Sequence, residues 1–225
     1  MSARAALDLS VYLVTDPALC GARGVVDVVA RAVDGGVRVV QLRDKHAEAS
    51  ALLDQLDAVA RVIDGRATLL VNDRLDVALA ARAEGLRVDG VHLGQGDAAV
   101  VVARDRLGAD AVVGLTANSE AHLATVARMP RGTVDYLGVG VIRPTATKPD
   151  HPPALGVDGF ARFAAQAELP CVAIGGIGLA DLAPLREAGA AGVAVVSAIC
   201  AADDPREAAE TFAVEWAARE TEAAR

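Results

Sequence analysis

The residues with the clearest capacity for chemistry follow an apolar run in the stretch DYLGVGVIRPTATKPD, residues 135–150. Residues 136–142 predict a buried strand, which must end near Pro144 because proline cannot donate to a sheet ladder. The next polar side chains are two hydroxyls and an ammonium group, those of Thr145, Thr147 and Lys148. Hydrogen-bond donors around a cation suit an anionic oxygen cluster such as phosphate or diphosphate. A solvated turn explains the same residues equally well, so the rest of the chain has to decide.

Other residues with chemical potential recur where predicted strands end. They are Gln41, Arg43, Lys45, Asn72, Asp73, Asp97, Gly175, Gly176 and Ser197. Arg43, Lys45 and Lys148 would supply charge-assisted hydrogen bonds to phosphate oxygens. The paired glycines allow close approach of the backbone, so they and the segment at Ser197 predict a second phosphate site. For each motif alone, an ordinary turn or a solvated side chain is the alternative.

Two carboxylates predict a metal site. Asp73 and Asp97 follow consecutive strands, so their side chains could share one ion. Mg²⁺ is usually held by one or two carboxylates together with substrate phosphates. Each aspartate also lies in a sequence typical of a turn. The three basic residues expected at the same end of the sheet favour the Mg²⁺ site over a plain turn.

Eight apolar runs, each followed by a helical pattern, must position these side chains. The predicted strands are residues 11–15, 37–42, 68–71, 90–93, 111–115, 136–142, 170–174 and 192–196. The predicted helices are residues 25–33, 52–63, 76–84 and 98–107, a segment capped by Ser119, and residues 157–167, 179–188 and 208–224. Continuous apolar strands imply burial on both faces and a parallel sheet. Eight such units close most simply into a single-domain (β/α)₈ TIM barrel over residues 1–225, frayed after about residue 217. A doubly wound open sheet is the alternative.

Composition narrows the partners and the location. A net charge of −8 and a pI of about 5.0 argue against nucleic acid or an anionic membrane as the main partner, and small-molecule substrates are expected. The three cysteines show no disulfide or metal-binding spacing, which suits a reducing cytosol. The first residues lack a signal peptide, and no apolar run reaches the ~18 residues of a membrane span, so a cytoplasmic location is expected. Subunit number is left open.

Seven motifs cover most of the chain, from Tyr12 to Ile199. They are YLVTD (12–16), QLRDK (41–45), LLVNDR (69–74), DGVHLGQGD (89–97), DYLGVGVIRPTATK (135–148), CVAIGGI (171–177) and GVAVVSAI (192–199). Together, and in this order, they resemble the thiamine phosphate synthase family. One motif would be weak support, whereas seven in register make the resemblance specific.

The resemblance implies a Mg²⁺-dependent transferase that joins hydroxymethylpyrimidine diphosphate to a thiazole phosphate, giving thiamine phosphate and diphosphate. It implies a dissociative mechanism, in which the diphosphate leaves before the thiazole nitrogen captures a pyrimidine methyl cation. The pyrimidine diphosphate would contact Gln41, Arg43, Lys45, Asn72 and Lys148. Mg²⁺ would be bound by Asp73 and Asp97. The thiazole phosphate would lie among Thr145, Thr147, Gly176, Val196 and Ser197. The implied catalytic residues are Arg43, Lys45, Thr116 and Lys148, and Thr116 is also implied to bind substrate.

The chain departs from the family pattern at a few positions. Many members have a serine and a histidine where this chain has Thr116 and Asn118. Thr116 keeps the hydroxyl, whereas Asn118 loses the imidazole and is given no role. Many members carry a proline and an aromatic residue in place of Val141 and Arg143, and Arg143 would add a cation near the predicted diphosphate site. His92 is also given no role, because a lone histidine in an apolar strand is more often a core residue than a catalyst.

Two other functions fit a barrel of this kind. A thiazole tautomerase of the same barrel family would need neither diphosphate nor metal. Such an enzyme would have no function for the residues of QLRDK and PTATK or for the two aspartates. A non-catalytic protein that binds thiamine precursors would keep the pocket, and the intact acidic pair and Lys148 count against it. Metal-dependent release of diphosphate separates the synthase from both.

Overall fold

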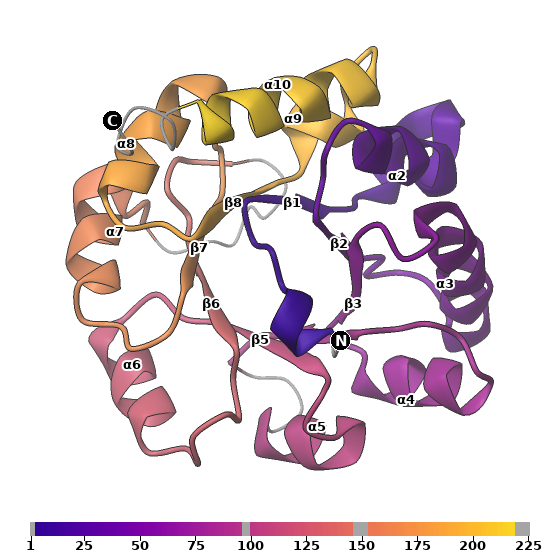
Figure 1. Ribbon diagram of the computed structural model, residues 1–225, viewed down its shortest axis with the longest axis horizontal. Helices are drawn as coiled ribbons and strands as arrows, with labels where there is room; N and C mark the ends of the chain where they lie inside the picture. Colours follow the sequence, from indigo (N-terminus) through magenta and orange to yellow (C-terminus); the bar gives the residue numbers. More distant parts are fainter. Residues whose placement is uncertain (1–2, 96–99, 146–152, 219–225) are drawn as a thin grey trace.

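The apolar runs of the sequence form a closed barrel of parallel strands in the computed structural model, which describes residues 3–95, 100–145 and 153–218 (Figure 1). Each strand pairs with the next along the chain, and β8 returns to pair with β1. The strands are β1 (Val11–Val14), β2 (Val39–Leu42), β3 (Thr68–Asn72), β4 (Gly90–Leu93), β5 (Val112–Thr116), β6 (Tyr136–Gly140), β7 (Cys171–Ile174) and β8 (Gly192–Val195). The predicted (β/α)₈ barrel is therefore confirmed.

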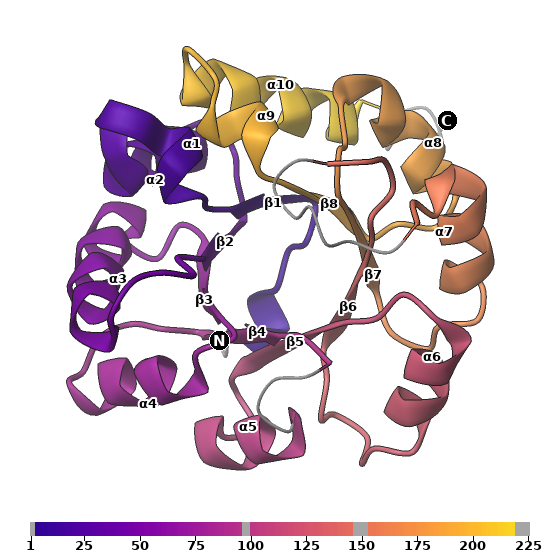
Figure 2. The same ribbon diagram turned by 180° about the vertical axis from the view of Figure 1, so that it is seen from behind.

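Helices surround the barrel on all sides, as the two opposite views show (Figures 1 and 2). They are α1 (Pro17–Cys20), α2 (Gly24–Asp34), α3 (Ala49–Ile63), α4 (Leu75–Ala83), α5 (Val100–Leu107), α6 (Glu120–Ala127), α7 (Gly156–Ala164), α8 (Leu182–Glu187), α9 (Ser197–Cys200) and α10 (Pro205–Ala217). Short 3₁₀ turns form η1 (Arg4–Ala6), η2 (Gly21–Arg23) and η3 (Leu179–Asp181). The helix predicted over residues 208–224 begins earlier, because Asp204 caps its first turn.

Burial on both faces explains why the strands are apolar throughout. Outward side chains such as Leu13 and Val40 join a core cluster that includes Val28 and Val29 of α2. Inward side chains form a second, smaller cluster, whose strand residues are Tyr12, Val14, Val39, Leu70, Val112, Tyr136, Val172 and Ala194. A two-sided environment of this kind selects a continuous apolar run over an alternating one.

Strand β6 ends at Gly140, two residues before the predicted end. The next two backbone carbonyl groups form hydrogen bonds outside the sheet. Val141 and Ile142 accept hydrogen bonds from the backbone N–H groups of Leu155 and Gly156 at 2.8 and 3.1 Å. The chain after β6 is thereby fixed to the start of α7, which places the segment up to Thr145 over the end of the barrel.

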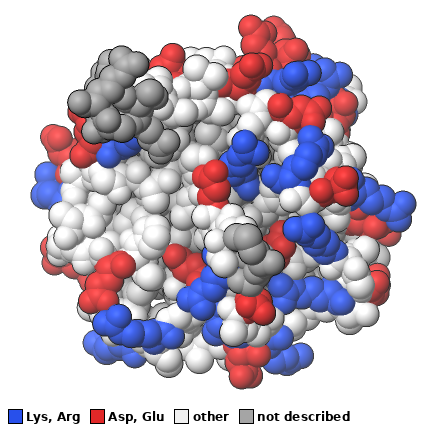
Figure 3. Space-filling model, viewed as in Figure 1, with Lys and Arg blue, Asp and Glu red and all other residues white. Residues whose placement is uncertain are grey.

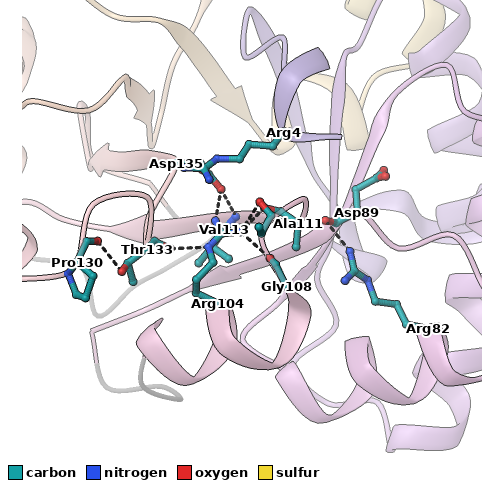
Figure 4. A network of polar contacts seen from close by, with 11 residues as sticks. Arg4, Arg82, Asp89, Arg104, Gly108, Ala111, Val113, Pro130, Thr133 and Asp135 are labelled. Carbon is teal, nitrogen blue, oxygen red and sulfur yellow. Dashed lines mark hydrogen bonds and ion pairs between the residues drawn. The ribbon is translucent and has the colours of Figure 1, made fainter. Parts of the chain in front are cut away.

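The amino-terminal end of the barrel is closed. Turn η1 lies in front of the barrel opening in Figure 1, and Ala3 and Leu7 on either side of it pack against the interior cluster. A polar network lies at the same end (Figure 4). Asp135 accepts from Val113 N at 2.8 Å, and its carboxylate pairs with Arg104 at 2.6 Å and with Arg4 at 2.5 Å. This end of the barrel therefore serves stability, which leaves the opposite end for a site.

Acidic and basic side chains are interspersed on the face shown in Figure 3, mainly over α2, α3 and α4, while few lie between α6 and α7. Because the two signs of charge are mixed, no single sign of electrostatic potential extends over this face. None of the helices in the described part of the chain has the length and apolar character needed to cross a membrane.

Candidate active site

A cavity of about 230 Å³ opens at the carboxyl-terminal ends of the strands, the end facing the viewer in Figure 2. The sequence-predicted residues that line it are Gln41, Arg43, Lys45, Asn72, Asp73, Thr116, Thr145, Gly176, Val196 and Ser197. Asp97, Thr147 and Lys148 lie outside the described residues. The fold thus gathers residues from six different strand ends at one place, whereas their individual roles stay predictions.

The cationic side of the cavity follows β2. Gln41 is buried, Arg43 is partly buried and Lys45 is exposed, so the three run from the barrel interior to its rim. The Arg43 backbone is fixed by Thr15, whose Oγ1 accepts from Arg43 N at 2.9 Å. The Arg43 guanidinium lies 3.6 Å from the carboxylate of Asp16. Arg43 is therefore held in place at the mouth before any anion binds.

Asp73 lies at the mouth in an unusual backbone conformation. Its φ is 60°, in the left-handed region that costs an L-residue roughly 1 kcal/mol or more. The conformation is held by Asp73 N, which donates to His92 O at 2.9 Å, and by Asn72 Nδ2, which donates to Asp73 Oδ2 at 2.6 Å. In this left-handed conformation the Asp73 carboxylate lies beside the Asn72 side chain. The two side chains together place oxygen atoms suited to a hard cation at the cavity edge.

Another side of the cavity, at the ends of β7 and β8, is formed largely by backbone. Gly175 and Gly176 have φ values of 98° and 65°, and the segment after β6 lies directly on them. A Cβ on Gly176 would approach the carbonyl oxygen of Pro144 to 2.9 Å. Ser197 begins the short helix α9, whose first N–H groups have no partner within the helix. This arrangement suits an anion bound by backbone donors.

Arg143 does not direct its charge toward the cavity, contrary to the prediction of an added cation at the diphosphate site. Its Nε donates to Asp181 Oδ1 at 2.8 Å, and Nη2 contacts the same oxygen. The other oxygen of Asp181 accepts from Gly178 N at 3.0 Å. The pair joins the segment after β6 to the turn after β7, so Arg143 fastens the wall of the cavity.

Replacing Asp181 by asparagine is expected to lower the free energy of unfolding by about 1–2 kcal/mol near neutral pH. Arg143 beside it lowers the pKa of the Asp181 carboxyl. The contribution of the ionised Asp181 carboxylate to folding stability is thus fully present above the unfolded pKa of roughly 3.9. This contribution is lost as pH falls through the lower pKa of the folded state. Denaturant titrations should give wild-type and variant stabilities that converge in acid. A constant difference would contradict this, and exposed Asp158→Asn is the matched control.

Several residues that line the cavity had no role predicted from the sequence. Tyr12, His92 and Tyr136 point into the barrel from apolar runs, and His92 contacts both Tyr136 OH and Thr116 Oγ1. Asn118 also lines the cavity, where its Nδ2 donates to Gly140 O at 3.4 Å. For His92 and Tyr136, a signal in the sequence was the glycines within β5 and β6, which leave room for large inward side chains.

Comparison with known proteins decides the family. A model described as thiamine monophosphate synthase matches residues 11–199, which include every described site residue. The chain belongs to the thiamine monophosphate synthase family. A relative named thiamine-phosphate synthase, from Psychrobacter sp. (strain PRwf-1), is 46% identical over 202 residues, which cover 90% of this chain and 92% of the relative.

Two further proteins, one of them a solved structure, are also similar to this chain. A thiamine-phosphate synthase of Azorhizobium caulinodans is 45% identical over 206 residues, or 91% of this chain and 93% of that protein. The solved structure of thiamine phosphate pyrophosphorylase from Pyrococcus furiosus has a TM-score of 0.79 at 28% identity, covering 93% of this chain and 96% of that chain. This member of the thiamine monophosphate synthase family is therefore an enzyme, a transferase of thiamine biosynthesis.

Proposed function

We propose that the enzyme condenses hydroxymethylpyrimidine diphosphate with a thiazole phosphate, giving thiamine phosphate and diphosphate. The observation that carries the proposal is a cavity with one cationic side and one side of backbone N–H groups, each of which could bind an anion. Arg43 and Lys45 stand at the end of β2, and the Gly176 and Ser197 backbone stands at the ends of β7 and β8. Two phosphorylated substrates need two such sides, and a cavity of this size between them brings their reacting atoms together.

The reaction requires the protein to stabilise the charge on the leaving diphosphate and to position the two substrates. The bond between the pyrimidine methylene and the diphosphate oxygen breaks, and its electron pair leaves with the diphosphate. The thiazole nitrogen then forms a bond to the methylene carbon, and no proton has to be removed. Arg43 and Lys45 would stabilise the departing charge, with Lys148, which lies outside the described residues. Cations preorganised at a leaving group stabilise the transition state more than the ground state.

The donor chemistry at the end of β3 fits Mg²⁺. The Asp73 carboxylate and the Asn72 amide offer hard oxygens at the cavity. Within the described residues, no group of three or more His, Cys, Asp or Glu side chains gathers to hold a metal. Mg²⁺ in general relies on few protein ligands and on substrate phosphates. Asp73 would hold the ion with Asp97, which lies outside the described residues. Bound there, Mg²⁺ supplies positive charge to the diphosphate oxygens.

Release of diphosphate by the purified protein tests this function. We expect release to require both substrates and Mg²⁺, and to stop with EDTA. Asp73→Asn should lower kcat/KM about 100-fold, because the neutral amide binds a divalent cation poorly. Exposed Asp76→Asn, on α4 close by in the sequence, is the matched control and should keep full activity.

The other outcomes are informative. Binding of the thiazole phosphate without any release of diphosphate would reject the synthase and favour a tautomerase or a binding protein. Release that is unaffected by EDTA and by Asp73→Asn would keep the reaction and reject the metal site.

A further inference from the structure

A chain of five polar side chains crosses the barrel interior beneath the cavity. Gln41 Nε2 donates to Tyr12 OH at 2.5 Å, and Tyr12 OH lies 2.8 Å from Tyr136 OH. Tyr136 OH lies 2.9 Å from His92 Nδ1, and His92 Nε2 lies 3.0 Å from Thr116 Oγ1. The chain therefore runs from one predicted substrate-binding residue, Gln41 on β2, to another, Thr116 on β5.

The barrel interior is shaped around this chain. A Cβ on Gly114 would lie 2.3 Å from the Tyr136 ring and 2.6 Å from His92 Nδ1, and a Cβ on Gly138 would lie 2.9 Å from His92 Cε1. Both tyrosines are fully buried and pack edge to face, with ring centroids 5.9 Å apart. Buried hydroxyls are costly unless they are hydrogen-bonded. An all-apolar interior would fill the same space without that cost, so the polar chain calls for a functional reason.

The direction of the chain follows from its first member. An amide nitrogen only donates, so the Tyr12 oxygen accepts from Gln41, and the Tyr12 proton is left for Tyr136. Tyr136 then donates to His92 Nδ1, which places the imidazole proton on Nε2, where it is donated to Thr116 Oγ1. The hydroxyl proton of Thr116 is consequently left for another acceptor. Burial raises the pKa of both tyrosines, so both hydroxyls keep the protons that this direction requires.

We infer that Tyr12, Tyr136 and His92 are positioning residues that hold the Thr116 hydroxyl as a hydrogen-bond donor to a substrate atom in the cavity. The inference rests on the proposed function. It also sets a chemical requirement, since the substrate atom at Thr116 must be an acceptor, such as a ring nitrogen or a phosphate oxygen. A substrate that presents an N–H or O–H there would face a second donor and would be rejected.

The tautomer of His92 tests the direction without any activity measurement. Two-bond ¹H–¹⁵N correlation spectra of the labelled protein distinguish Nε2–H from Nδ1–H imidazole, and His92→Gln assigns the signal. We expect Nε2–H in the wild type. Gln41→Glu replaces the donor by an acceptor of the same shape, so it should reverse the chain and give Nδ1–H. An Nδ1–H tautomer in the wild type, or no change in Gln41→Glu, would overturn the inference.

A double-mutant cycle tests whether the chain acts through Thr116. Tyr136→Phe keeps the ring and removes the hydroxyl, and we expect it to lower kcat/KM about tenfold, the size of one lost hydrogen bond. In a Thr116→Val background the same change should cost less than about twofold, because the group through which it acts is gone. A tenfold loss in both backgrounds would show an independent structural effect and reject the role. Thr125→Val, which removes an exposed hydroxyl on α6, is the matched control.

Separate kinetics for the two substrates identify the acceptor. If the loss in Tyr136→Phe falls on kcat/KM for the pyrimidine diphosphate, the acceptor belongs to that substrate, and a loss confined to the thiazole phosphate assigns it to the other. An equal loss for both, with no coupling to Thr116, overturns the inference. If the wild type releases no diphosphate, the proposed function fails, whereas the His92 spectra still decide the direction of the chain.

Discussion

Replacing Arg43 by methionine is expected to lower kcat/KM for diphosphate release about 1000-fold, the upper range for loss of one preorganised donor to a developing anion. The guanidinium lies at the mouth of the cavity, and its backbone is tied to Thr15. Charge on the leaving diphosphate is largest in the transition state, so kcat should fall more than KM rises. Steady-state kinetics with both substrates measure the effect.

Arg43→Lys separates charge from geometry. Lysine keeps the positive charge but lacks the planar fork that binds two phosphate oxygens at once, so an intermediate loss of roughly 10–100-fold is expected. Arg61→Met is the matched control, since this arginine lies on the outer helix α3 with a side chain 77% exposed. A loss below tenfold in Arg43→Met, with the fold intact, would remove Arg43 from the catalytic machinery.

The second large effect concerns stability at the other end of the barrel. Asp135→Asn is expected to lower the free energy of unfolding by about 3–5 kcal/mol, the usual cost of removing one partner from a buried ion pair. The Asp135 side chain is only 4% exposed and faces two arginines, Arg4 and Arg104 (Figure 4). An asparagine keeps the shape but leaves the partly buried Arg104, whose side chain is 14% exposed, without its counter-charge.

Chemical denaturation measures this loss, and the melting temperature should fall by roughly 10 °C. The folded fraction should keep wild-type kcat/KM, because Asp135 lies at the end of the barrel opposite the cavity. Asp105→Asn, an exposed change on α5, is the matched control. A loss below about 1 kcal/mol would mean that solvent reaches the network and screens it.

The barrel could be predicted because a parallel strand buried on both faces has a local signature. Each strand carries apolar residues at successive positions, and a helical pattern follows it. Short elements lacked such a signature. Helix α9 spans only Ser197–Cys200, too little for periodicity, and β6 ended early because the carbonyls of Val141 and Ile142 bond to the start of α7.

The mouth of the site could be predicted in part for the same reason. Polar residues directly after apolar strands, such as Arg43 and Asp73, must lie at one end of a parallel barrel. The direction and the contacts of each side chain could not be predicted. Arg143 carries the same charge as Arg43, yet its contact with Asp181 directs it to the wall of the cavity. That contact joins residues 38 positions apart, and nothing near Arg143 in the sequence indicates it.

The sequence by itself indicated eight strand-helix units, the family and, given a parallel barrel, the end at which the polar residues gather, whereas the closed strand order came from the structure. Only the tertiary structure decided that Tyr12, Tyr136 and His92 form one polar chain between Gln41 and Thr116. The sequence around each of these residues indicates only a buried, apolar strand. Their hydroxyl and imidazole groups meet only because closure of the barrel brings β1, β4 and β6 around a common interior, where the glycines at 114 and 138 leave space. Hydrogen bonds between such distant positions depend on closure, which no local pattern encodes.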